Sequence, residues 1–266
     1  QNQGYHTIDI NEGQWSGKYR SMHIGFDEYY DEKEPPLNAD RTITRGFSAL
    51  QNNIRTLKTK EKQLLLFHSN ILHSNPFRYP LNRTRITDPQ IDYIPSKDGE
   101  WYGVSHHLFT DGVMDQEKKA KYINTDWMND STVEEYERLT KKIYEQQIRF
   151  ADEELGKIFN YLEKENMTNN TIILLYATHG DGLFDNRVAI RGVSYQSCIH
   201  VPLLIRHPKI LEQTRIRIPV ALIDLPSTLY TMVGIRGLDK GLLSVIQPQI
   251  PNREYVVGIN NQDRYI

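Results

Sequence analysis

A histidine and an arginine lie in a polar loop between two apolar runs of the chain. The first run, residues 172–177, stops at Thr178-His179-Gly180, and the second, residues 201–205, follows a loop that contains Arg191. This pattern predicts strand, loop, strand. An imidazole can bind a metal ion or move a proton, and a guanidinium binds anionic oxygen atoms. Open α/β sheets place such chemistry at the carboxyl ends of their strands, so we expect His179 to belong to a functional site.

Two further predicted strands end in polar residues. Residues 6–10 lead to Gln14 and Trp15, and residues 64–68 lead to His73. We expect these strand ends to share one crevice with His179. Structural interpretations also remain open: His179 could cap a turn, His73 could pack in a loop, and Arg191 could be a surface arginine.

The elements between these strand ends follow from hydrophobic periodicity. A helical period over 133–165, ended by Asn166, precedes the strand at 172, which predicts half of a βαβ unit. A short strand at 216–219 and a helix that begins near Asp224 should follow. Residues 77–130 show no period and form a long irregular insertion. The helical positions are Tyr136, Leu139, Ile143, Phe150, Leu155, Ile158 and Leu162.

Composition excludes several classes of function. The chain has 266 residues, 38% hydrophobic and 25% charged, with a net charge of −2. Mixed charges argue against a dedicated nucleic-acid surface, and no apolar run approaches the roughly 20 residues that span a bilayer. The single cysteine, Cys198, rules out an internal disulfide. Four glycosylation sequons begin at Asn82, Asn129, Asn166 and Asn169.

Nine motifs in order resemble the sulfatase family of the alkaline-phosphatase superfamily. The family carries Gly-Tyr-x-Thr, Gly-Lys-Trp-His, Gly-Phe-Asp, His-x-Pro, Asp-x-x-Leu-Gly and Asp-His-Gly, followed by a Lys-Gly step, Val-Pro-Leu-Ile and Asp-Leu-x-Pro-Thr-Leu. The corresponding runs here are 4–7, 13–16, 25–27, 73–76, 152–156 and 177–180, then 191–192, 201–204 and 224–229. The resemblance covers residues 4 to about 235.

The resemblance implies a fold and a chemistry. The fold would be a mostly parallel sheet sandwiched by helices, incomplete at its N-terminus, with residues 1–235 as the domain and 236–266 as its weakly patterned extension. The chemistry would be hydrolysis of a sulfate ester through a covalent intermediate, with a divalent metal, Ca²⁺ by family, that polarises the transferred group. His179 would bind the metal, while His73 and Arg191 would neutralise charge on the oxygens.

The same comparison shows departures that bear on activity. Thr178 replaces the metal-binding Asp, and Gln14 and Ser16 replace the Lys and His of Gly-Lys-Trp-His. Lys18 or His23 could substitute for the lost pair. Asp181 and Asp185 could be replacement ligands, although Gly-Asp-Gly is first a turn signal. The family's nucleophile and two carboxylates precede Gly-Tyr-x-Thr, and that region is absent here; Cys198 lacks the nucleophile's context.

Three functions follow as alternatives. The first is a sulfatase whose 266 residues alone are inactive, the second a catalytically dead relative kept for binding or structure, and the third a phosphoester hydrolase or phosphotransferase. Expected partners are a sulfated or anionic small molecule or glycan, and the missing N-terminal portion or another protein chain. The family and the sequons together predict an extracytoplasmic location: secreted, periplasmic or lysosome-like.

Overall fold

The computed structural model describes residues 3–12, 23–31, 44–56, 62–69, 72, 109–110, 113–114, 130–184, 195–209, 213 and 215–235. The chain divides into two compact units. The first comprises Gln1–Asn166 and Asp181–Arg191, and the second comprises Met167–Gly180 and Gly192–Ile266.

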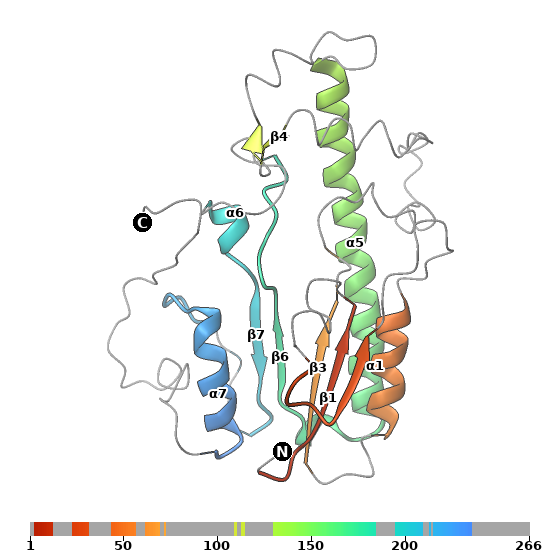
Figure 1. Cartoon of the computed structure of the whole chain (residues 1–266), viewed down its shortest axis with the longest axis vertical. Coiled ribbons are helices and arrows are strands. Elements are labelled where there is room, and N and C mark those ends of the chain that lie inside the picture. Colours follow the sequence, from red (N-terminus) through yellow and green to blue (C-terminus); the bar gives the residue numbers. More distant parts are fainter. Residues whose placement is uncertain are drawn as a thin grey trace. The chain divides into compact units, whose positions relative to one another are not determined.

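The first unit contains a three-stranded parallel sheet (Figure 1). Its strands are β1 (His6–Asn11), β2 (Glu28–Asp31) and β3 (Gln63–His68), in the order β2-β1-β3. In the register, Ile8 lies opposite Glu28 on β2 and Leu65 on β3. Residues on both faces of β1 are buried, among them Ile8, Ile10 and Asp9. The central strand is therefore enclosed on both sides, as is usual in parallel sheets.

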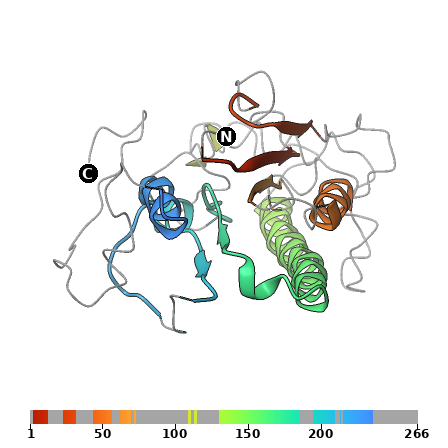
Figure 2. The same cartoon turned by 90° about the horizontal axis from the view of Figure 1, so that it is seen from below.

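Two helices of the first unit lie side by side, α1 (Thr44–Thr56) and α5 (Asp130–Lys164), as Figures 1 and 2 show. The Arg55 guanidinium lies 5.9 Å from the centre of the Tyr161 ring and joins them. The Phe47 ring meets the Phe67 ring of β3 edge-on at 5.0 Å. Apolar positions at helical spacing form the core of both helices: Phe47, Leu50, Ile54, Phe150, Ala151, Ile158 and Leu162.

The second unit is built on an antiparallel pair, β6 (Ile173–Tyr176) and β7 (Leu203–Arg206), with Leu174 opposite Ile205. The short helix α6 (Gln196–Ile199) precedes β7, and α7 (Leu225–Met232) follows the 3₁₀ turn Leu222–Asp224. Pro226 lies in the first turn of α7, where its missing N–H costs nothing. Another 3₁₀ turn, Thr168–Asn170, joins α5 to β6.

These elements confirm the predicted α/β fold with a parallel sheet and helices, and the periodic helix matches α5 closely. The predicted strand at 216–219 is wrong, since residues 215–221 form no strand. Its alternating Ile and Arg residues run into Pro219, which lacks the N–H that a ladder needs. The run 197–200, which precedes the second apolar run, lies mainly in helix α6.

Little of the predicted insertion at 77–130 falls within the described residues. Its described part consists of two short antiparallel strands, β4 (Phe109–Thr110) and β5 (Val113–Met114), and the first residue of α5. The 236–266 extension lies outside the described residues. Among the residues that the structure does describe, no helix is both long and apolar enough to cross a bilayer.

Candidate functional site

The loop after β6 holds His179 in a defined orientation. The imidazole Nδ1 of His179 lies 3.1 Å from the carbonyl oxygen of Gly180, and the side chain is half-buried. A carbonyl can only accept, so Nδ1 carries the hydrogen in this contact, and the other nitrogen, Nε2, is the basic one. Metal-binding histidines are commonly oriented by such a second contact. The geometry therefore suits His179 as a ligand or base through Nε2.

Close backbone packing holds this loop against α6. The amide of Gly180 donates to the carbonyl of Cys198 at 2.8 Å. A Cβ atom added at Gly180 would overlap the backbone carbonyl oxygen of Ser197. Only glycine allows this approach, so the Gly that follows His179 has a packing role. Cys198 in the same contact region is a buried free cysteine.

Asp181, the proposed replacement ligand, is directed into the interior of the first unit. Its side chain is 8% exposed, and its negative charge acts on the Tyr144 hydroxyl of α5. Burial, and secondarily Asp181, raises the pKa of Tyr144 above its usual value. This placement favours a packing role for Asp181.

The described residues of this strand end do not fit a calcium site. Ca²⁺ takes six to eight oxygen ligands, mostly carboxylates and carbonyls. Here Thr178 presents a neutral, exposed hydroxyl, and His179 presents nitrogen. Among the described residues no group of three His, Cys, Asp or Glu side chains could hold a metal ion.

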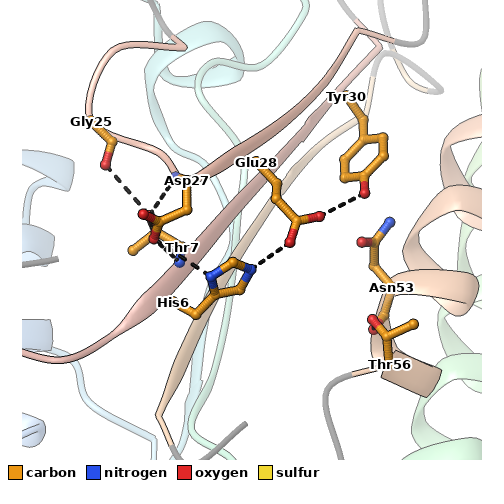
Figure 3. A network of polar contacts seen from close by, with 8 residues as sticks. All are labelled: His6, Thr7, Gly25, Asp27, Glu28, Tyr30, Asn53 and Thr56. Carbon is orange, nitrogen blue, oxygen red and sulfur yellow. Dashed lines mark hydrogen bonds and ion pairs between the residues drawn. The ribbon is translucent and has the colours of Figure 1, made fainter. Parts of the chain in front are cut away.

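At the amino-terminal edge of the parallel sheet in the first unit, two of the sequence motifs bind each other (Figure 3). The Asp27 carboxylate accepts from the Thr7 amide at 2.8 Å and from the Thr7 hydroxyl at 2.9 Å. The Asp27 amide donates to the Thr7 carbonyl at 2.9 Å. Gly-Tyr-x-Thr and Gly-Phe-Asp therefore join β1 to β2, and these two motifs stabilise the sheet at the amino-terminal edge of its strands.

His6 and Glu28 extend this network (Figure 3). The imidazole Nε2 of His6 lies 2.5 Å from Oε1 of Glu28, and the Tyr30 hydroxyl donates to Oε2 of Glu28 at 2.7 Å. The hydrogen bond to Glu28 raises the pKa of Tyr30 above its usual value. His6 and Glu28 are half-buried and Asp27 is exposed, so their ion pairs contribute little. Thr7 is buried, and we expect the hydrogen bond of its hydroxyl to contribute more to stability.

Replacing Thr7 with valine is expected to destabilise the chain by about 1 to 2 kcal/mol, because the hydroxyl bound to a carboxylate is lost while the shape is kept. The Thr7→Ser variant keeps the hydroxyl and serves as the control, with a smaller loss. Urea unfolding of both variants measures the difference. Equal losses in the two variants would show that the hydroxyl contributes nothing.

At the carboxyl edge of the sheet, Glu12 links three elements. Its amide donates to the His68 carbonyl at 3.0 Å, and its carboxylate accepts from the Ser69 hydroxyl at 2.5 Å. A Cβ added at Gly46, in the first turn of α1, would overlap the same carboxylate. A negative group near a helix N-terminus is favourable. Glu12 thus fixes the strand ends that precede the Gln14 and His73 segments.

The remaining predicted site residues lie outside the described part of the chain. These are Gln14, Trp15, Ser16, Lys18, His73, Asp185 and Arg191. His23 is described, and its ring meets the Tyr29 ring at 5.8 Å. Sequence reasoning also missed a Ser-x-Pro-x-Arg run at residues 74–78. Its residue types match the family's nucleophile pattern. That run follows β3, whereas the family's nucleophile precedes the strand equivalent to β1.

Sequence reasoning also missed Asp9 and Glu12. Asp9 is fully buried at 0% exposure, and neither carboxylate oxygen has a hydrogen-bond partner among the described residues. Burial raises its pKa from 3.8 to about 6. The alternation Ile8-Asp9-Ile10 is typical of a strand with one solvent-exposed face. The sequence therefore did not indicate that both faces of this strand are buried.

Proteins of known structure share this fold. A protein solved with its substrate D-glucosamine-2-N,6-O-disulfate matches with a TM-score of 0.59 at 17% identity, covering 94% of this chain and 63% of that one. The phosphonate monoester hydrolase of Silicibacter pomeroyi matches with a TM-score of 0.59 at 16% identity, covering 93% and 60%. The Sulfatase family model matches residues 1–235. The chain belongs to the sulfatase family.

Curated relatives agree over shorter stretches. The choline-sulfatase of Rhizobium meliloti is 27% identical over 113 residues, which is 42% of this chain and 22% of the relative. Arylsulfatase K of Mus musculus is 30% identical over 85 residues, or 32% and 15%. The matched stretch is therefore less than a quarter of either relative's length.

Proposed function

We propose that the protein hydrolyses a sulfate ester, with a sulfated small molecule or glycan as substrate. The family match over residues 1–235 carries this proposal. Relatives named as sulfatases support it, as does a structural neighbour whose substrate is a disulfated glucosamine. The phosphonate hydrolase shares the fold equally well, so the choice of sulfur rests on the sequence relatives.

In this proposal three side chains have separate roles. His179 acts as a ligand or a base through Nε2, and its Nδ1 contact with the Gly180 carbonyl orients the ring for this role. Arg191 binds anionic oxygens of the sulfuryl group with its forked guanidinium, and His73 stabilises charge that develops on them. The sulfatase family generally depends on a divalent metal. The Ca²⁺ proposed by resemblance would need oxygen ligands beyond Thr178.

We further propose that these 266 residues alone do not catalyse turnover. Thr178, Gln14 and Ser16 replace a metal-binding carboxylate, a cation and a proton donor. Removing a single group that stabilises charge in the transition state typically costs a factor of about 10² to 10³. The alternative of a binding subunit rests on the same substitutions.

The test measures hydrolysis of an aryl sulfate and an aryl phosphate by the purified chain, with Ca²⁺ or Mn²⁺. No metal-dependent turnover is expected from the 266 residues. The Ser74→Ala variant is assayed beside the wild type. If the wild type turns over substrate and Ser74→Ala does not, Ser74 acts as the nucleophile and the proposed inactivity is wrong. Preference for the phosphate would overturn the sulfate-ester proposal.

Binding distinguishes a retained site from a lost one. Calorimetry should show that Ca²⁺ binds weakly to the wild type and about tenfold more tightly to Thr178→Asp, which restores a carboxylate, and that inorganic sulfate binds the chain. His179→Ala should abolish the binding, whereas His200→Ala, an exposed histidine of the same unit, should leave it unchanged. Equal binding by both histidine variants would exclude His179 from the site.

A further inference from the structure

The turn between α5 and β6 contains two adjacent sequons that the hydrolytic site does not use. The sequons Asn166-Met167-Thr168 and Asn169-Asn170-Thr171 lie next to each other in this turn. Both asparagines are exposed. Within the described residues, neither side-chain amide makes a hydrogen bond. The folded chain therefore leaves space at both amides for an added group.

The backbone directs Asn166 away from the helix. Its φ angle of 56° lies in the left-handed region, which asparagine tolerates better than most residues, at the point where α5 ends. The backbone amide of Asn166 donates to the Glu163 carbonyl at 3.0 Å and caps the C-terminal end of the helix. The Asn166 side chain takes no part in this contact. A large substituent on Nδ2 would meet solvent.

In the second sequon, Thr171 has a structural role in the turn. The Thr171 hydroxyl donates to the Met167 carbonyl at 2.8 Å. The Arg206 guanidinium of β7 donates to the carbonyls of Thr168 at 2.5 Å and Thr171 at 3.3 Å. These contacts give Thr171 a structural reason to be threonine. None of them uses the side chain of Asn166, so a substituent there leaves the turn intact.

We propose that Asn166 carries an N-linked glycan. In the transfer, Nδ2 of Asn166 forms a bond to the anomeric carbon of a polyprenyl-diphosphate-linked oligosaccharide. The bond from that carbon to the diphosphate oxygen breaks, the lipid diphosphate leaves with the electron pair, and the amide loses one proton to a base of the transferase. The modification requires passage through a glycosylating compartment, and it is independent of whether the protein hydrolyses sulfate esters.

The test expresses the full chain behind a secretory leader in eukaryotic cells. Site-resolved mass spectrometry after enzymatic glycan removal in heavy-oxygen water reads Asn166 directly. Glycan is expected at Asn166 in the wild type and in Thr171→Ala, and it is expected to disappear in Thr168→Ala, which destroys only the first sequon. Thr168→Ser keeps the sequon and should keep the glycan.

Two outcomes would overturn the proposal. One is a secreted wild-type chain with unmodified Asn166, and the other is a glycan found on Asn169 while Asn166 stays bare. If Thr168→Ala is not secreted, the Asn166→Gln variant is used in its place. The mass of the intact protein is then compared between Asn166→Gln and Asn169→Gln. A loss of one glycan in both asparagine variants supports the assignment of Asn166; a loss only in Asn169→Gln overturns it.

Discussion

The Asp9→Asn variant should be about as stable as the wild type near pH 4 and about 3 kcal/mol more stable at pH 7. Asp9 is completely buried in the central strand, and within the described residues its carboxylate oxygens have no hydrogen-bond partner. Desolvation raises its pKa from 3.8 to about 6. A difference of this size corresponds to about 3 kcal/mol between the two protonation states.

The sign follows from proton binding. Between pH 3.8 and about 6 the folded state holds a proton on Asp9 that the unfolded state has released, so this group's contribution to stability falls as the pH rises through that window. Above pH 6 both states are ionised at Asp9 and its cost stays constant. Asparagine does not ionise and lacks this slope.

Urea unfolding of both proteins from pH 4 to pH 7 measures the difference, in which the other carboxylates cancel. Asp152→Asn, an exposed position on α5, is the matched control and should change stability by less than about 0.5 kcal/mol. An Asp9→Asn variant less stable than the wild type at pH 7 would contradict the prediction, because it would mean that the Asp9 carboxylate has a favourable partner.

The Gly180→Ala variant should lose about 3 kcal/mol of stability. Its added methyl group would overlap the Ser197 carbonyl oxygen. The hydrogen bond of 2.8 Å from the Gly180 backbone amide to the Cys198 carbonyl keeps residue 180 from moving away. Overpacking against backbone costs about 1 to 3 kcal/mol, because neither side can rotate away. We also expect sulfate binding to weaken, because His179 precedes the displaced residue.

Gly156 on α5 provides the matched control. A Cβ there meets no atom within 4 Å, and alanine favours a helix over glycine by about 1 kcal/mol. Gly156→Ala should therefore stabilise the chain while Gly180→Ala destabilises it, both measured by thermal and urea unfolding. If the two variants shift stability in the same direction, the close approach of Gly180 to α6 is not present in solution.

Local patterns predicted most of the elements. The helical period over 133–165 anticipated α5, and the apolar runs at 172–177 and 201–205 anticipated β6 and β7. The same reasoning failed at 216–219, where an alternating run forms no strand. A strand needs a neighbour to satisfy its backbone, and a sequence pattern does not reveal whether a neighbour exists.

By itself, the sequence determined the family, the α/β class and the position of His179 after a strand, because motif order and periodicity are written locally along the chain. Only the tertiary structure decided that Thr7 and Asp27 bind each other, that Gly180 packs on α6, and that Asp9 is enclosed on both faces. Each of these depends on residues brought together from distant parts of the chain. Burial and contact are properties of that assembly, so no window of sequence contains them.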